Sequence, residues 1–390
     1  MAKKSASEEI GGRASRFRQL KHYVPQPLRP FARAFYRQLA GMTATGRSER
    51  VAGEIATYTG CEEVHDLPPI AHYWSNRYLV PMIQTLGFPN VTDMFRHYIR
   101  TAIHNAPDRC AILSVGAGAG STEIALVRSL LDEGLRNFRF ECLDINPDSL
   151  QRGARRSAEL GVQDWISFRE FDVNSWNPER GYRVVLAIQS LHHFVELEAL
   201  FRKIRHALNP RGYFLVDDMI GRNGHRRWPE ALRITRQLWA ELPEKYKHNH
   251  GTGLVEHEFE NADASVIGFE GIRAQDILPL LLMNFRFEIF LGFANLIDPF
   301  IDRGFGPNFD PNSTWDRTFI DRVHSLDMQY LEAGTLKPTH LYAVMGLNTD
   351  AQARVFKHLT PEASVRWPLR RWNWRARHWL TGHKASERPS

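Results

Sequence analysis

A glycine-rich turn is the first feature of the chain whose residue types could do chemistry. It follows the apolar residues 111–115 and places Gly116, Gly118 and Gly120 at alternate positions. Glycine permits a sharp turn and lets a ligand approach the backbone closely. Turns of this kind bind several classes of nucleotide-containing cofactor. The stricter dinucleotide pattern would need glycine where this chain has Ser121, so the turn counts against a nicotinamide dinucleotide.

Polar residues also follow the next three apolar segments. Asp144 closes the second segment, where a carboxylate can accept hydrogen bonds from both hydroxyls of a ribose. Asp172 follows the third segment and can accept a hydrogen bond from an adenine amino group. Gln189 begins the sequence Q-S-L-H-H-F after the fourth segment. The carboxyl ends of parallel strands meet at one edge of a sheet, so these residues predict a binding site for an adenosine-containing cofactor there.

The elements that must position these residues alternate between short apolar runs and helical stretches. That alternation is typical of a parallel sheet. The predicted strands are residues 111–115, 139–143, 166–170, 184–188 and 213–216, followed much later by 285–290 and 339–345. The predicted helices between the early strands are residues 121–133, 148–160 and 196–207.

The stretch from about Cys110 to Asp218 resembles the core of class I S-adenosylmethionine-dependent methyltransferases. The glycine turn, the acid after the second strand, the aspartate after the third and the S-L-H-H-F sequence occur in that family's order. The resemblance implies an α/β fold with a Rossmann-like seven-stranded sheet and helices on both faces. Its last strand would be antiparallel and lie between strands five and six. It also implies S-adenosyl-L-methionine as cofactor, and we place the chain near uncharacterised bacterial methyltransferases.

The resemblance assigns cofactor contacts residue by residue. The three glycines of the turn would lie under the methionine part of the cofactor. The expected cofactor-binding residues are Gly116, Ala117, Gly118 and Gly120 in the turn, Asp144 and Ile145 at the ribose, Asp172 and Val173 at the adenine, and Gln189 near the methionine end. The family often has an acid two residues before the first glycine, but this chain has Ser114. The cofactor's ammonium group would then meet backbone carbonyls or another acid, such as Glu123.

Methyl transfer to a hydroxyl or an ammonium group also needs a base that removes a proton. The candidates that follow strands four and five are His192, His193, Asp217, Asp218 and His225. A histidine of ordinary pKa can serve as a base near neutral pH. We predict His193 and Asp218 as the catalytic residues, with His192 next. The alternative is that the paired histidines cap the following helix or pack against the cofactor.

A metal site is not predicted. His248, His250 and His257 have a spacing that could bind a metal, but they lie in a glycine-bounded loop that lacks the rigid elements such sites need. The chain has 3 cysteines, too few for a disulfide framework, which favours a reducing compartment. Neither an N-P-P-Y-like sequence nor a cysteine follows the fourth strand, which argues against the DNA- and RNA-methylating classes that use them.

The two late strands are separated from the core by long insertions, which we expect to form a lid over the site. A helical block before the first strand would contribute to the same substrate site. The predicted organisation is a basic N-terminal segment with an amphipathic helix at 1–50, a helical substrate or lid block at 51–105, the cofactor-binding domain at 106–347 with insertions at about 219–284 and 292–337, and a basic Trp/Arg-rich tail at 348–390.

Positive charge is concentrated at the two ends of the chain. Eleven Lys/Arg and three Glu fall in residues 1–50, and seven Lys/Arg with one Glu fall in residues 366–390. The intervening body therefore has a net charge of −8, which does not suit nucleic acid. No apolar run suits a signal peptide or a membrane span, so we expect a cytoplasmic protein. The basic ends suggest peripheral contact with the inner face of a membrane, or packing on the body or on another subunit.

These features predict a methyltransferase acting on an oxygen or nitrogen of a small or medium-sized acceptor, with a glycan, a lipid-linked molecule or a secondary metabolite as acceptor classes. One alternative is a nicotinamide-dependent oxidoreductase, which Ser121 and Asp172 oppose. Another is a non-catalytic partner subunit with a methyltransferase fold. The oligomeric state is left open.

Overall fold

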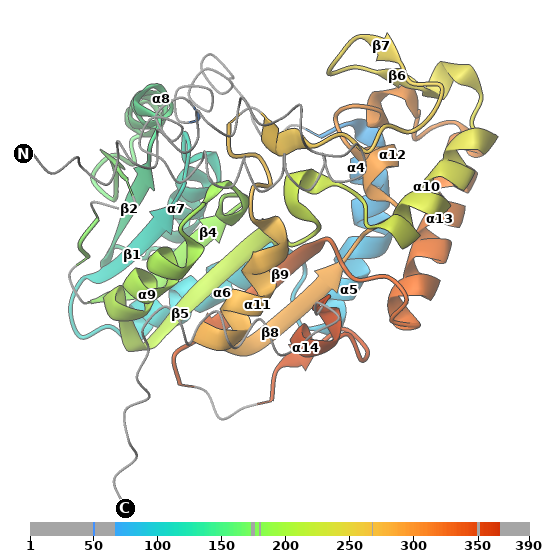
Figure 1. Cartoon of the computed structure of the whole chain (residues 1–390). Helices are drawn as coiled ribbons and strands as arrows, with labels where there is room; N and C mark the ends of the chain where they lie inside the picture. The colour runs from blue at the N-terminus through green and yellow to red at the C-terminus, as the bar shows by residue number, and fades with distance from the viewer. Residues whose placement is uncertain are drawn as a thin grey trace, which may run out of the picture.

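A mixed sheet of eight strands runs through the protein (Figure 1). The structure is a computed structural model that describes residue 50 and residues 67–172, 176–178, 181–266, 268–348 and 352–366. The strand order is β10-β8-β9-β5-β4-β1-β2-β3. The strands are β1 (Cys110–Val115), β2 (Phe138–Asp144), β3 (Ile166–Glu170), β4 (Tyr182–Ile188), β5 (Leu208–Met219), β8 (Arg286–Phe293), β9 (His340–Gly346) and β10 (Arg354–Val355).

The first five strands are parallel, and β9 lies antiparallel between β5 and β8. The seven predicted strands are therefore confirmed in their order, including the insertion of the last one between strands five and six. The largest difference in length is at β5, predicted as 213–216. Pro210 and Gly212 interrupt its apolar run, but pairing with β9 continues to Met219 opposite His340.

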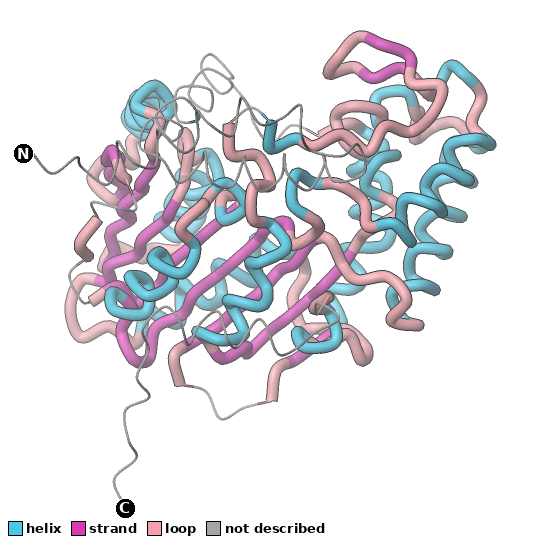
Figure 2. Tube along the Cα trace, viewed as in Figure 1, coloured by secondary structure: helices cyan, strands magenta, loops and turns pink. Residues whose placement is uncertain are grey.

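Helices cover both faces of the sheet, as predicted (Figure 2). Alternate strand residues point to opposite faces, which divides the core into two clusters. Ile112 of β1 belongs to the cluster under α6 and α7, whereas Leu113 belongs to the cluster under α9 and α11. The helices that flank the sheet are α6 (Val91–His104), α7 (Ser121–Asp132), α8 (Pro147–Glu159), α9 (Leu197–Ala207), α11 (Ala274–Asn284) and the short α14 (Pro361–Ser364).

The remaining helices gather beyond one end of the sheet, at the right of Figure 1. They come from before β1 and from the two insertions, and their buried side chains continue the core cluster under α6. These helices are α4 (Pro69–Trp74), a π-helical turn η2 (Ser75–Leu79), α5 (Val80–Thr85), α10 (Pro229–Glu241), α12 (Asp298–Ile301) and α13 (Thr314–Glu332). A small hairpin of β6 (His248–Asn249) and β7 (Leu254–Val255) lies at the outer side of this group.

Two boundaries differ from the prediction. Helix α11 lies within the predicted first insertion, but it packs against α9 on the sheet, so the part that leaves the sheet ends before Ala274. The predicted tail from residue 348 includes an eighth strand, because β10 pairs parallel to β8. Two residues are too short a run for a periodic signal, which is why the sequence did not indicate this strand.

The amphipathic helix predicted within the basic N-terminal segment and most of the Trp/Arg-rich tail lie outside the described residues. Within the described ranges, no helix combines the length and the apolarity needed to cross a membrane.

Candidate active site

A cavity of about 890 Å³ opens at the carboxyl ends of the parallel strands. This volume is near the upper end of the range for small-molecule sites. Its walls come from the glycine turn, the residues that follow β2, β4 and β5, the residue pair 269–270, residues 301–304 and the helices before β1. The cavity is therefore shared between the sheet and the helical group beyond it.

The glycine turn forms one wall of the cavity. The backbone N–H groups of Gly116 and Ala117 donate to the carbonyl of Leu143, at 2.7 and 3.0 Å. Gly118 N–H donates to Oδ2 of Asp144 at 2.8 Å, so the acid after β2 holds the turn in place. Gly118 has a positive φ of 56°, and a Cβ added there would meet nothing within 4 Å. A side chain at this position would project into open space.

The predicted cofactor residues line this cavity together. They are Gly116, Ala117, Gly118, Gly120, Asp144, Ile145, Asp172 and Gln189. Val173 lies outside the described residues. Gln189 has a positive φ of 50° and its side-chain amide donates to Asp217 at 2.6 Å. Burial, together with the neighbouring Asp218, raises the pKa of Asp217 to about 7.

Glu123 does not lie in the cavity wall, contrary to the suggestion that it meets the cofactor's ammonium group. The hydroxyl of Ser114 donates to Glu123 at 2.6 Å, and both side chains are buried. Burial raises the pKa of Glu123. Ser114, which stands where the family often has an acid, is therefore paired with a buried carboxylate outside the cavity lining.

Asp218 is fully buried and is not among the cavity-lining residues. Its carboxylate accepts hydrogen bonds from the backbone N–H groups of Ser190, Leu191 and Met219, at 2.9, 2.6 and 2.7 Å. It also contacts Nδ1 of His192 at 2.7 Å. This placement corrects the prediction of Asp218 as the base, because the carboxylate cannot reach a substrate. It orients His192 instead.

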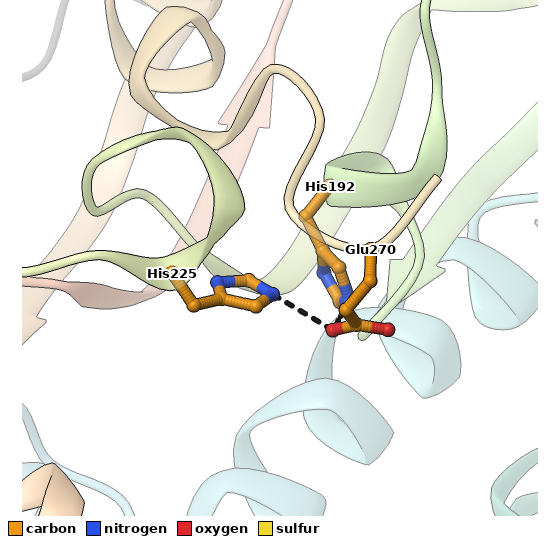
Figure 3. Close-up of side chains that lie close together, drawn as sticks. All are labelled: His192, His225 and Glu270. Carbon is orange, nitrogen blue, oxygen red and sulfur yellow. Dashed lines mark hydrogen bonds and ion pairs between the residues drawn. The ribbon is translucent and has the colours of Figure 1, made fainter. Parts of the chain in front are cut away.

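The two predicted histidines lie in the cavity wall, beside a residue that the sequence did not indicate. His192 and His193 form a short turn, η3 (Leu191–His193), and both approach Glu270. His192 Nε2 lies 3.5 Å from Glu270 Oε1, and His193 Nε2 lies 3.6 Å from Glu270 Oε2. His225 makes the closest contact, 2.7 Å from its Nε2 to Glu270 Oε1 (Figure 3).

Burial and charge give His192 and His225, which both contact Glu270, different protonation states. Burial alone would lower the pKa of His192, but the carboxylates of Asp218 and Glu270 outweigh it and raise this pKa to about 10. Burial lowers the pKa of His225, and the nearby His192 adds to this effect against the opposing hydrogen bond to Glu270. Burial would raise the pKa of Glu270, but hydrogen bonds from His192 and His225 hold it far below its usual range. Near neutral pH, a neutral His225 therefore faces an ionised Glu270 and a cationic His192.

Two glycines let the backbone bring His225 and Glu270 together. Gly224 N–H donates to the carbonyl of Gly271 at 2.8 Å, and both glycines have positive φ. A Cβ at Gly271 would lie 2.9 Å from the His225 ring, so only glycine leaves room for the imidazole. His225 itself has a positive φ of 53°, a conformation that is uncommon outside glycine.

The H-x-H sequence does not form a comparable group. His248 and His250 lie on the outer hairpin with ring centroids 4.7 Å apart, and His257 is exposed beside Glu244. Among the described residues, the set whose ligand atoms all lie within 4.8 Å of one another is His192, His225 and Glu270. This group therefore contains the candidate base, and it is also the candidate position for a cation.

Comparison with known proteins identifies the region that forms the turn and the first five strands. A family model described as a methyltransferase domain matches residues 113–214. The strand order agrees with that expected for class I enzymes. This region is a class I S-adenosylmethionine-dependent methyltransferase domain. The methyltransferase domain uses S-adenosylmethionine, so the nicotinamide alternative is set aside.

The curated proteins that match the methyltransferase domain are fungal synthases. The highly reducing polyketide synthase AFT9-1 of Alternaria alternata is 30% identical over 114 residues, which cover 27% of this chain and 4% of that protein. The hybrid PKS-NRPS synthetase apdA of Emericella nidulans is 30% identical over 138 residues, which cover 34% of this chain and 3% of that protein. The chain thus spans only a few per cent of the length of these relatives. None of them supports placement in a bacterial branch.

Among solved structures, the fold is similar to geranyl diphosphate C-methyltransferase from Streptomyces coelicolor A3(2). The identity is 14%, with 65% of this chain and 79% of that chain covered and a TM-score of 0.36. It is also similar to the DszA carbon methyltransferase, with 18% identity, 53% and 51% coverage and a TM-score of 0.33.

The residues of the cavity fit S-adenosylmethionine. The open space at Gly118 leaves the backbone accessible to a ligand, and the carboxylate of Asp144 lies beside it, where it can accept ribose hydroxyls. Asp172 lines the same cavity at the end of β3, in the place expected for the adenine. The individual cofactor contacts remain predictions.

Replacing Gly118 with arginine should abolish cofactor binding, because the new side chain would fill the open space beside the turn. We expect the Kd for S-adenosylhomocysteine, measured by calorimetry, to rise by about 100-fold or more. Gly134→Arg is the matched control, since Gly134 also has a positive φ and no atom within 4 Å of an added Cβ but lies away from the cavity. Equal binding by the two variants would exclude this turn as the cofactor site.

The raised pKa of His192 predicts a loss of stability at alkaline pH. A group whose pKa is raised on folding stabilises the protein fully below its unfolded pKa of about 6.5, and that contribution is lost as the pH rises through about 10. The free energy of unfolding, measured with urea, should therefore decrease between pH 7 and 10. His192→Gln should make this decrease shallower, while the exposed His257→Gln should not. Parallel curves for all three proteins would contradict the assigned charge of His192.

Proposed function

We propose that this chain methylates an acceptor whose reacting atom loses a proton to His225. The contact between His225 and Glu270 in the cavity wall carries the proposal. When bound, S-adenosylmethionine supplies an electrophilic methyl group. His225 and Glu270 come from segments that follow β5, and they line the same cavity as the glycine turn, so acceptor and cofactor would meet in this cavity.

His225 suits the role of base better than the predicted His192. His192 holds a proton near neutral pH because two carboxylates surround it, so it cannot accept another. His225 is neutral, and its Nε2 contacts Glu270. With Nε2–H donated to Glu270, the lone pair that accepts a proton is on Nδ1. Within the described residues Nδ1 makes no hydrogen bond, and it is not among the atoms sealed from solvent.

Glu270 makes proton uptake by His225 favourable. Its carboxylate stays ionised, so an imidazolium at His225 would form an ion pair with it at 2.7 Å. The same carboxylate fixes the orientation of the ring, as the aspartate does in a Ser-His-Asp triad. His192 and Asp218 stand behind Glu270 and hold it in place through His192 Nε2.

The acceptor class that we favour is a polyketide-type acyl chain, which is a secondary metabolite. The matching curated proteins are polyketide synthases, and such chains carry carbonyl groups at alternate carbons. A carbon between two carbonyls is acidic enough for a histidine base, so carbon joins the predicted oxygen and nitrogen as an acceptor atom. An apolar chain would fit the cavity, because much of the cavity wall beyond the glycine turn is hydrophobic. These side chains are Ala71, Trp74, Leu79, Phe95, Phe293 and Ile301.

A glycan or a lipid-linked acceptor remains a second class, to be tested in the same assay. Peripheral membrane contact through the basic ends is also a proposal, and residues 1–49 and 367–390, which would make it, lie outside the described residues. A panel with radiolabelled methyl donor that contains a β-ketoacyl thioester, a phenol, an amine and a glycolipid would identify the acceptor atom. Absence of product with every class, while S-adenosylmethionine binds, would favour a non-catalytic partner subunit.

His225→Gln should reduce kcat/KM by about 10²- to 10⁴-fold, the usual contribution of a general base, with unchanged affinity for S-adenosylhomocysteine. Wild-type activity should decrease as the pH falls through the pKa of His225, which lies below the ordinary value of about 6.5. Glu270→Gln removes a contact that raises this pKa, so the acidic limb of the profile should move to lower pH. His257→Gln should keep both rate and profile. An unchanged profile in Glu270→Gln would exclude the His225–Glu270 pair as the base.

Chelation distinguishes the base from a cation centre built by the same residues. A ligand atom bound to zinc lies about 2.0–2.2 Å from the ion, which leaves two ligands of one ion farther apart than the 2.7 Å between His225 and Glu270. We therefore expect full methyl transfer after exhaustive treatment with EDTA. Loss of activity that a divalent ion restores would reassign the three residues as a metal centre.

A further inference from the structure

Arginine side chains line the acceptor side of the cavity next to the candidate base. The connection from β5 to α10 carries a short turn, η4 (Asn223–His225), with Arg222 before it and Arg226 after it (Figure 1). Both arginines line the cavity, as does the following Arg227. Arg226 is the residue next to His225 in the chain, so positive charge lies close to the position where the acceptor loses its proton.

The three arginines differ in how far their charge is neutralised. Arg227 forms a close ion pair with Asp298, at 2.7 Å. Arg226 donates to the backbone carbonyl of Asn223 at 3.1 Å and has a carboxylate of Asp263 only at 3.8 Å. Arg222 donates to the backbone carbonyl of Arg227 at 3.0 Å. Across the described residues, no carboxylate lies at ion-pair distance from Arg222.

The surroundings of Arg222 are themselves positive. Its guanidinium lies 5.3 Å from the centre of the Trp228 ring, and the guanidinium of Arg366 lies 4.2 Å from the same centre. Arg366 is in turn paired with Glu230. Burial lowers the pKa of Arg222, and the positive charges of Arg226 and Arg366 lower it further, against a smaller opposing effect of Asp263. An anion in the cavity would relieve this repulsion.

We infer that the methyl acceptor carries a phosphate group, which Arg222 and Arg226 bind beside the base. This inference rests on the proposed function, because that function makes this side of the cavity the acceptor site. Phosphate fits better than carboxylate because a phosphate ester can carry two negative charges, and two guanidinium groups supply two positive charges in a geometry that suits its oxygens. The acceptor would thus have an apolar chain in the cavity and a phosphate at Arg222.

Binding of inorganic pyrophosphate to the full chain saturated with S-adenosylhomocysteine tests this site without any methyl transfer. Calorimetry should detect pyrophosphate binding, and Arg222→Gln and Arg226→Gln should each weaken it by about ten-fold or more. Arg222→Lys keeps a charge but loses the fork geometry, so it should bind with intermediate affinity. Arg211→Gln is the matched control, because Arg211 is exposed near the opposite end of β5 from the cavity.

Several results would overturn the phosphate site. These are no pyrophosphate binding to the wild-type chain, equal loss in Arg211→Gln, or acetate binding as tightly as pyrophosphate. Unchanged affinity for S-adenosylhomocysteine in each variant shows that the variant is folded, so weaker pyrophosphate binding then supports the site. A chain that does not bind pyrophosphate could still show the shifted pH profile in Glu270→Gln. Conversely, an unchanged pH profile in that variant would not affect pyrophosphate binding. The two proposals can therefore fail separately.

Discussion

The rest of the site depends on the hydrogen bonds that the buried carboxylate of Asp218 makes. It receives three backbone N–H groups and one imidazole, and so joins the end of β5 to the turn that follows β4. Together with Glu270, this carboxylate raises the pKa of His192 to about 10 despite its burial, so His192 is a cation near neutral pH. That cation keeps Glu270 ionised, and Glu270 in turn orients His225. The carboxylate of Asp218 thus acts on His192 directly, and through His192 it influences Glu270 and His225.

The site is assembled from segments that only the tertiary structure brings together. The backbone N–H of Ile272 donates to the carbonyl of His192 at 3.1 Å, and the N–H of Gly224 donates to the carbonyl of Gly271. The connection before α11 is therefore hydrogen-bonded to His192 and to the residue before His225. Three of the four described non-glycine residues with positive φ line the cavity, which places backbone strain where the chemistry is expected. They are Gln189, His225 and Ala294. The sheet supplies the wall with the glycine turn and Asp144, and the inserted connections supply the groups that we propose meet the acceptor.

The sequence predicted the sheet well, and it indicated residues that share one wall of the cavity, because both depend on local signals. A glycine turn after an apolar strand, or an acid at a strand end, can be recognised within a few residues, and Gly118 and Asp144 indeed contact each other. Glu270 could not be found in this way. It follows no strand, and it lies 45 residues from His225, so nothing local links the two. Asp218 was recognised as important, but its role as base or as partner depended on burial, which a single sequence does not reveal. The adjacent Glu270 and Gly271 were the only local signal that the sequence offered for this pair.

The glycines beside His225 and Glu270 also make this pair recognisable in other sequences. Both Gly224 and Gly271 have positive φ, each precedes or follows a member of the pair, and their backbones are bonded to each other. A relative that keeps the histidine and the glutamate but replaces Gly271 would crowd the imidazole. The useful signature is therefore the doublet Gly-His after the fifth strand and the doublet Glu-Gly before the next crossover helix, with a freely variable distance between them. Chains that carry both doublets could be sorted from the wider fold class by inspection alone.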